Sequence, residues 1–235
     1  MNILDVALAA ALTLPLASVA HAGLIGPSGG TGLSGEYARA SDSPFAGTSF
    51  SWFYLENFED HLFNTPGVSA DAGGVTSVVF GPSIHDSVDL DDGVLDGSGL
   101  NGDSYFSGNG AAGITFTFSA ATLGALPTHA GIVWTDGAGT TSFEAFDHSG
   151  VSLGVINANL ADASFNGETA EDRFLGAVDP LGISAIHISN SSGGIEVDHL
   201  QYGLASAVPE PGSQALMLAG LGFAGWIARR RGRAR

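Results

Sequence analysis

The stretch ITFTFS, residues 114–119, alternates apolar and polar side chains from end to end. Successive side chains of a β-strand point to opposite faces of a sheet, so this stretch predicts a strand with Ile114 and both phenylalanines buried. GISAIHISN, residues 182–190, alternates in the same way after one break in parity. EAFDHSGVSLGVI, residues 144–156, consists of two such runs joined at DHSG, which predicts a hairpin turn.

Other short apolar runs between residues 50 and 203 are separated by Gly, Asp, Asn and Pro, which favour turns. No apolar stretch in this region has a convincing helical period. The pattern predicts an all-β fold, a single β-sandwich domain of jelly-roll type over residues 50–203. The predicted strands are 50–58, 75–80, 114–119, 130–134, 142–147, 151–155, 173–177, 183–189 and 195–202.

The charge of the chain limits its partners. Twenty-two acidic residues and only two arginines lie between residues 23 and 208, a net charge of −20. Such a surface repels nucleic acid and anionic membranes and favours cations, so no nucleic-acid partner is expected. The chain has no cysteine, which excludes disulfides, zinc–thiolate sites and thiol catalysis.

The N-terminal segment, residues 1–22, has the pattern of a signal peptide. Residues 6–16 are apolar, and Ala-His-Ala at 20–22 is a small-x-small cleavage site. The first residues contain no Lys or Arg, which departs from the usual pattern and leaves the start codon open; a buried N-terminal helix is the alternative. Residues 23–49 form a Gly/Ser-rich lead-in with room for one edge strand.

The C-terminal segment, residues 204–235, has a tether followed by three parts. Val-Pro-Glu-Pro at 208–211 precedes an apolar stretch at 215–228, and a cluster of five arginines closes the chain at 229–235. A helix of the apolar length would be ~21 Å long, shorter than the ~30 Å hydrocarbon core. Flanking arginines can stay on the cytoplasmic side, however, so we expect a short transmembrane helix that serves as a processed signal.

These three parts resemble a PEP-CTERM sorting domain. The resemblance implies a Gram-negative bacterium that makes exopolysaccharide, processing by the membrane protease exosortase near the Pro-Glu-Pro motif at 209–211, and transient insertion into the inner membrane. It also implies export to the cell surface or extracellular matrix. The residues that carry the signal are Val208, Pro209, Glu210, Pro211, Arg229, Arg230 and Arg231.

Two further stretches, FYLENFED at 53–60 and GGIEVDHLQYG at 193–203, resemble the first and last strands of galactose-binding-like and related carbohydrate-binding jelly rolls. In those domains an early acidic residue and an Asp of the closing strand often meet at a structural Ca²⁺. The matching residues here are Glu56, Glu59, Asp60, Glu196 and Asp198.

The closing strand also favours a metal by its own pattern. Ile195 and Val197 have one parity and Leu200 and Tyr202 the other, so burial of all four requires a bulge near Asp198-His199. A bulge can direct a carboxylate towards a cation, and oxygen ligands suit Ca²⁺. The alternative is an Asp198 that faces solvent or accepts a turn amide.

A second acidic stretch, residues 86–103, contains six Asp in eighteen residues. Asp89, Asp91, Asp92 and Asp96 are candidate ligands of a second Ca²⁺ loop. The spacing departs from the EF-hand, with Gly at the fifth position and Leu100 at the twelfth, so a solvated acidic turn is the alternative.

No motif indicates catalysis. The strings GSGLNG at 97–102 and GPSGG at 26–30 lack the strand and helix that a phosphate loop or nucleophile elbow requires. Trp52 and Trp134 are candidates for stacking on sugars, with core packing as the alternative. We therefore expect a non-enzymatic surface or exopolysaccharide-matrix protein of structural or adhesive type, with weak Ca²⁺-dependent glycan contact. The alternatives are a secreted polysaccharide hydrolase and a matrix protein without a ligand.

Overall fold

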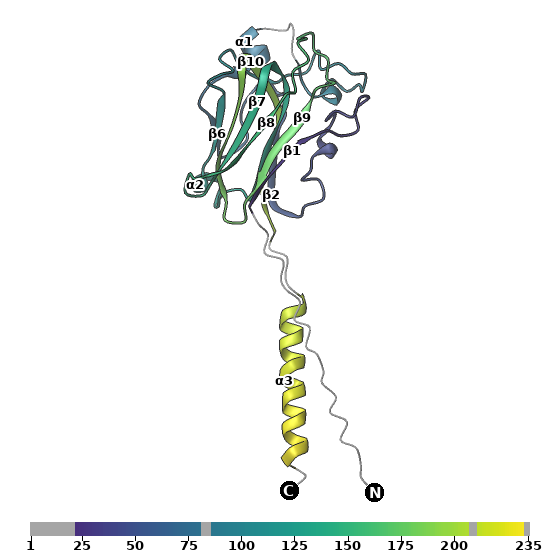
Figure 1. Cartoon of the computed structure of the whole chain (residues 1–235), viewed down its shortest axis with the longest axis vertical. Coiled ribbons are helices and arrows are strands. Elements are labelled where there is room, and N and C mark those ends of the chain that lie inside the picture. The colour runs from purple at the N-terminus through teal and green to yellow at the C-terminus, as the bar shows by residue number, and fades with distance from the viewer. Residues whose placement is uncertain (1–21, 81–85, 207–210, 233–235) are drawn as a thin grey trace.

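The structure is a computed structural model that describes residues 22–80, 86–206 and 211–232 (Figure 1). The predicted signal peptide, apart from Ala22, lies outside these residues, as do Val208, Pro209 and Glu210 of the sorting signal. The strands are β1 (Gly23–Ser28), β2 (Phe50–Glu56), β3 (Val68–Ala70), β4 (Gly74–Val75), β5 (Tyr105–Ser107), β6 (Ile114–Phe118), β7 (His129–Asp147), β8 (Ser152–Ala158), β9 (Arg173–Val178) and β10 (Ile183–Ala205). The helices are α1 (Thr76–Phe80), α2 (Ala120–Leu123) and α3 (Pro211–Gly232), with 3₁₀ turns η1 (Ala40–Asp42) and η2 (Asp89–Asp92).

The antiparallel ladder between β7 and β10 organises the domain. It runs from Ile183 opposite Asp147 to Gly203 opposite His129, with several shifts of register between. Its two ends meet, because the Ile183 N–H donates to the Pro127 carbonyl at 2.8 Å and the N–H of Thr128 donates to the Gly203 carbonyl at 2.9 Å. The ladder therefore folds over on itself near its middle, in a segment that we call the bend, residues 137–140 and 190–194.

Glycines make the bend. Gly139 and Gly193 have φ values of 79° and 71°, in the left-handed region that side chains with a Cβ rarely adopt. Because both long strands turn together, one ten-stranded sheet supplies both layers of a sandwich. The segments predicted as separate strands, 130–134 with 142–147 and 183–189 with 195–202, are accordingly the two halves of β7 and of β10.

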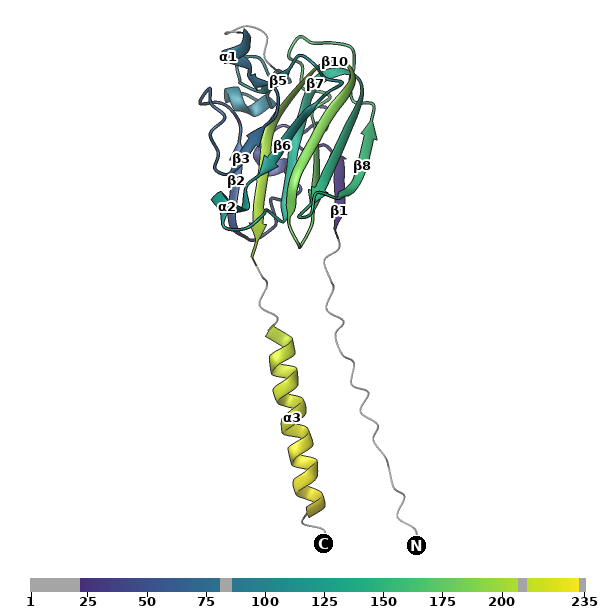
Figure 2. The same ribbon diagram turned by 90° about the vertical axis from the view of Figure 1, so that its left-hand side faces the viewer.

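The first layer has the order β1-β9-β7-β10, with β2 and β5 both pairing with β10 and β4 pairing with β5. The second layer contains the other halves of β7 and β10, flanked by β8 on one side and by β6 and β3 on the other. Figure 1 shows β6 and β1 on opposite sides of the domain, and Figure 2 shows the same layers turned by 90°. The predicted all-β sandwich of jelly-roll type is confirmed.

The main core fills the space between the layers. Ile114 and both phenylalanines of β6 are buried there as predicted, together with Trp134 and Phe143 of β7. A smaller cluster covers the outer face of the first layer. Its buried members are Tyr37, Phe45, Val88, Val133 and Phe174. The lead-in and the acidic stretch thus form a third layer of loops over the sheet.

Some local predictions were wrong. The predicted strand 75–80 is instead the end of β4 followed by α1. Carboxylate Oδ1 of Asp103 accepts the Thr76 hydroxyl and the Ser77 N–H, each at 3.0 Å, and so binds free donors of the first turn of α1. A residue distant in sequence therefore overrides the β-propensity of this run.

The lead-in supplies the edge strand β1, which pairs with β9.

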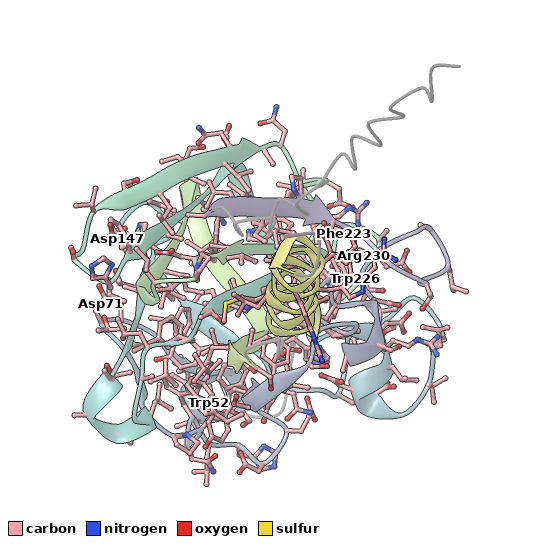
Figure 3. The ribbon with its side chains drawn as sticks, turned by 90° about the horizontal axis from the view of Figure 1, so that it is seen from below. Trp52, Asp71, Asp147, Phe223, Trp226 and Arg230 are labelled. Carbon is pink, nitrogen blue, oxygen red and sulfur yellow. The ribbon has the colours of Figure 1, made fainter. Side chains whose placement is uncertain are left out.

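The C-terminal helix α3 is longer than the predicted stretch 215–228. Apolar side chains on it are exposed, among them Phe223 and Trp226, and the Arg230 guanidinium carbon lies 4.3 Å from the Trp226 ring centroid (Figure 3). Within the described ranges, no helix combines the length and apolarity needed to cross a membrane. The helix is confirmed, whereas its insertion into a membrane stays a prediction.

Candidate functional site

Buried acidic side chains gather on the outer face of the first layer, next to the bend. Alternate residues of neighbouring strands share this face: Glu196 and Asp198 on β10, Thr135 on β7, and Asp172 just before β9. The segment beginning at Asp86 lies across them, because its backbone donates to the carboxylates of β10. We call this group of side chains the acidic cluster.

The bulge predicted in the closing strand is present. The register of β10 against β7 shifts between Asp198 and Gln201, and His199 has a φ of 45°. The shift buries all four apolar side chains of opposite parity, Ile195, Val197, Leu200 and Tyr202. It also leaves Asp198 fully buried, so the alternative of a solvent-facing Asp198 is wrong.

Glu196 and Asp198 are occupied by protein donors. Glu196 accepts the Ser104 hydroxyl and the Asp86 N–H at 3.2 Å. Asp198 accepts the Val88 N–H at 3.0 Å and the N–H of the following residue at 2.5 Å. Burial raises the pKa of Glu196 to about 7 and the pKa of Asp198 well above its ordinary value, the latter also because Asp91 is near. These two carboxylates fasten the loop layer to the sheet.

The other residues of the first predicted calcium set have separate contacts. Glu56 is buried and accepts three backbone N–H groups of the segment after β2, at 3.0–3.2 Å. Glu59 accepts the Asp103 N–H at 2.6 Å, and burial raises its pKa to about 7. Asp60 is exposed and accepts the Leu62 N–H at 3.0 Å. Calcium at this set stays a prediction.

The second predicted set forms a tight acidic turn. Asp89 is buried in η2 and accepts the N–H groups of Asp96 and Gly97 at 3.0–3.1 Å. Asp92 accepts the N–H two residues later at 2.9 Å, and Asp96 is exposed. These bonds stabilise the turn without a cation, so calcium here also stays a prediction.

Asp91 has a different role. In the described part of the chain, Asp91, Asp198 and His199 are the one group in which three His, Asp or Glu ligand atoms lie within 4.8 Å of one another. His199 bridges Asp91 and Tyr37, with its Nε2 2.8 Å from Asp91 Oδ2 and its Nδ1 3.1 Å from the Tyr37 hydroxyl. Hydrogen bonds therefore account for the close approach of His199 to Asp91, whereas Asp198 is held beside them by backbone N–H groups.

Asp86, Glu171 and Asp172 were not among the predicted residues. Burial raises the pKa of Glu171 to about 7 and the pKa values of Asp86 and Asp172 well above the ordinary range, and the neighbouring carboxylates raise them further. Parity could have indicated Asp172, because it lies two residues before the buried Phe174 and so on the same face of the sheet. Asp86 could not have been found, because only the folded chain brings it to this face.

The two tryptophans differ in exposure. Trp134 is fully buried and donates its indole N–H to Asn190 Oδ1 at 3.0 Å, so its predicted availability for sugar stacking is wrong. Trp52, labelled in Figure 3, is half-buried. It packs against Tyr54 and Tyr202, with ring centroids 5.7 and 6.3 Å away. Its stacking on a sugar stays a prediction.

A pocket of about 290 Å³ opens at the bend. Phe106 and the highly exposed Phe165, with 72 % of its surface accessible, contribute aromatic rings to it. Asp136 and Glu196 also line it and face each other across the ladder. Burial raises the pKa of Asp136 to about 6. The remaining lining is Gly137, Ala138, Gly193, Gly194 and Ile195.

The chain folds into a β-sandwich domain, which is followed by a separate C-terminal segment that contains α3. That segment, residues 207–231, matches the family model of the PEP-CTERM protein-sorting motif. The chain is therefore a carrier of this sorting motif, which implies a surface protein that is exported, attached to the membrane through its C-terminal region and processed by exosortase.

Among solved structures, the chain is similar to the C-terminal family 22 carbohydrate-binding module of Clostridium thermocellum Xyn10B and to a xylan-binding domain of the same family. Each is 14 % identical in sequence, and the comparison covers 69 % of this chain and 99 % of the other with a TM-score of 0.36. No curated protein matches the sequence.

Proposed function

We propose that the protein is a structural or adhesive component of the cell surface or exopolysaccharide matrix that holds neutral glycan in the pocket at the bend, without catalysis. The observation that carries the proposal is the pairing of Phe106 and Phe165 with acceptor groups in that pocket. Aromatic rings stack on the apolar faces of sugar rings, and carboxylates and backbone carbonyls accept sugar hydroxyls.

The size of the pocket limits the ligand. A volume of about 290 Å³ is at the lower end of small-molecule sites, which suits one or two sugar residues of a longer chain. Affinity per site is then weak, and adhesion comes from many copies on one surface. The net charge of −20 between residues 23 and 208 favours neutral over anionic polysaccharide.

The position of the pocket suits contact with glycan away from the membrane. Gly23, Val178, His129 and Gly203 are register partners at one end of the first layer, the end from which β10 leads to the sorting segment. The bend lies at the other end (Figure 1). An attached protein therefore presents the pocket at the end remote from its C-terminal attachment.

A glycan array with the full chain tests this proposal. Neutral polysaccharides should bind, and Phe165→Ala should reduce the binding about tenfold, the loss expected for one stacked ring. Leu181→Ala is the matched control, since Leu181 is equally exposed in a loop at the opposite end. Equal binding by Phe165→Ala and the control would refute the pocket. Binding to no glycan would favour a purely structural matrix protein.

One observation favours the alternative of a hydrolase. Asp136 and Glu196 are cross-strand partners in the pocket, both with raised pKa values, and a retaining glycosidase needs two carboxyl groups about 5–5.5 Å apart. Glu196 is buried and holds Ser104 and Asp86, however, which favours binding over catalysis. Release of reducing ends from a bound polysaccharide, abolished by Asp136→Asn, would establish the hydrolase instead.

A further inference from the structure

The acidic cluster contains buried oxygens that no protein donor reaches. Among the described residues, both carboxylate oxygens of Asp172, Oδ1 of Asp86, Oε2 of Glu171 and the hydroxyls of Thr135 and Thr169 are buried without a hydrogen-bond partner. Asp172, Thr135 and Thr169 are fully buried. An unpaired buried polar group costs about 1–3 kcal/mol, and a charged one more. Native proteins rarely leave such groups together unless an ion or ordered water satisfies them.

Thr135 and Asp172 lie at the same end of the ladder between β7 and β9. Trp134 opposite Arg173 is the last pair of this ladder, and Thr135 and Asp172 adjoin that pair along their own strands. Each lies two residues from a member of the outer cluster, Val133 or Phe174, which places it on the outer side of the sheet. The Asp172 N–H donates to the Thr169 carbonyl at 3.1 Å, which folds the preceding loop back towards the same place.

A second set of contacts brings in Asp86. The Thr169 N–H donates to the Gly97 carbonyl at 3.3 Å, and the Gly99 N–H donates to the Gly167 carbonyl at 2.8 Å. Oδ1 of Asp86 lies against Gly99, 2.7 Å from the position that a Cβ there would occupy. Asp86 is also the charged group with the largest electrostatic effect on Asp172. Two carboxylates from distant parts of the chain thus face one loop.

Among the residues that the structure describes, no cationic side chain forms an ion pair with this group. The domain has only two arginines, and in the described residues neither forms an ion pair with a carboxylate. Arg173 donates instead to the backbone carbonyls of Ala170 and Asp172, at 3.0 and 2.7 Å. Adjacent buried carboxylates must therefore bind protons or a cation, and extracellular calcium modules bind Ca²⁺ with dissociation constants of about 10⁻⁴–10⁻³ M.

We propose that Asp86, Asp172, Thr135 and Thr169 bind a Ca²⁺ ion between the sheet and the loop layer. All the free ligand atoms are oxygens, and Ca²⁺ takes six to eight oxygen ligands in flexible geometry, including backbone carbonyls and water. The carboxylate oxygens of Asp86, Glu171 and Asp172 do not all lie within 4.8 Å of one another, so the proposed ligand set contains two carboxylates and leaves Glu171 out. The ligands differ from both predicted sets, whose buried carboxylates, Glu56, Glu196, Asp198 and Asp89, accept hydrogen bonds from protein donors.

Such an ion would join β7, the approach to β9 and the segment beginning at Asp86. The loop that supplies Thr169 also carries Phe165, so the ion would order one wall of the pocket. Calcium dependence of glycan contact rests on the proposed function, whereas calcium binding itself does not. Calorimetry with CaCl₂ and no glycan therefore measures the binding of the ion by itself.

Titration calorimetry and scanning calorimetry of the full chain after EDTA treatment test the site, with CaCl₂ as the probe. Two variants remove ligands while keeping shape: Asp172→Asn and Thr169→Val. The matched control is Asp179→Asn, a buried Asp at the opposite end whose Oδ1 accepts the Leu181 N–H at 3.0 Å.

We expect Ca²⁺ to raise the melting temperature of the natural chain and of the control, and each site variant to bind it about tenfold more weakly or worse. In EDTA the order reverses: Asp172→Asn and Thr169→Val melt at or above the natural chain, because the first removes an uncompensated buried charge and the second an unpaired buried hydroxyl. Identical melting of the natural chain in Ca²⁺ and EDTA, or undiminished Ca²⁺ affinity in Thr169→Val, would overturn the proposal.

Discussion

Asn190 holds the bend together, and replacing it with Ala should destabilise the domain. Its Oδ1 accepts the Trp134 indole N–H at 3.0 Å and the Thr141 hydroxyl at 3.3 Å. Its Nδ2 donates to the Gly194 carbonyl at 2.8 Å. One side chain therefore links both halves of the ladder at the point where the sheet folds over, and Asn190→Ala removes all three bonds.

The magnitude follows from burial. A hydrogen bond contributes about 1 kcal/mol net, and an orphaned buried donor costs about 1–3 kcal/mol. Trp134 and Thr141 are both buried, so no water can replace the lost acceptor without a cavity. The alanine methyl fills only part of the space. We expect Asn190→Ala to reduce the free energy of unfolding by about 3 kcal/mol.

Urea denaturation of the full chain measures this change, with the m-value as a check that the transition itself is unaltered. Asn159→Ala is the matched control: this exposed Asn accepts the Thr140 hydroxyl at 3.0 Å and should cost less than about 0.5 kcal/mol. If Asn190→Ala destabilised the domain no more than Asn159→Ala, the bend would not depend on this side chain.

Two further predictions concern pH and a single hydroxyl. Burial raises the pKa values of Glu59 and Glu196 from 4.5 to about 7, so in EDTA the folded state binds more protons than the unfolded state. The free energy of unfolding should then fall by about 1 kcal/mol or more as pH rises from about 4.5 to about 7, and a urea midpoint that rises over this range would contradict the assignment. Tyr202 donates its hydroxyl to the Pro66 carbonyl at 2.5 Å, so Tyr202→Phe should cost about 1 kcal/mol in the same assay, and no loss would mean that water replaces the bond.

Local pattern was sufficient for the strands and for the class of fold. The alternation of residues 114–119 placed Ile114 and both phenylalanines in the core, and the DHSG turn joins β7 to β8 as predicted, with Gly150 at a φ of 79°. The opposed parities in the closing strand required the bulge that the structure contains. Such predictions succeed because side-chain direction in a strand depends on position alone.

Local pattern failed where a distant residue decides the outcome. Most of the predicted strand 75–80 forms the helix α1, which begins at Thr76, because Asp103 binds its first donors. From the sequence, Trp134 was a candidate for stacking on sugars. In the structure it is fully buried in the core and donates a hydrogen bond to Asn190. In both cases the partner is remote along the chain.

The sequence by itself determined the sorting signal, the acidic charge and the alternating strands, because each depends on neighbouring residues or on composition. Only the tertiary structure decided that β7 and β10 fold over to make both layers and that Asp86 and Asp172 face the same loop. The physical reason is that charge repulsion and burial depend on distances between side chains in space. Those distances exist only after the ladder has closed.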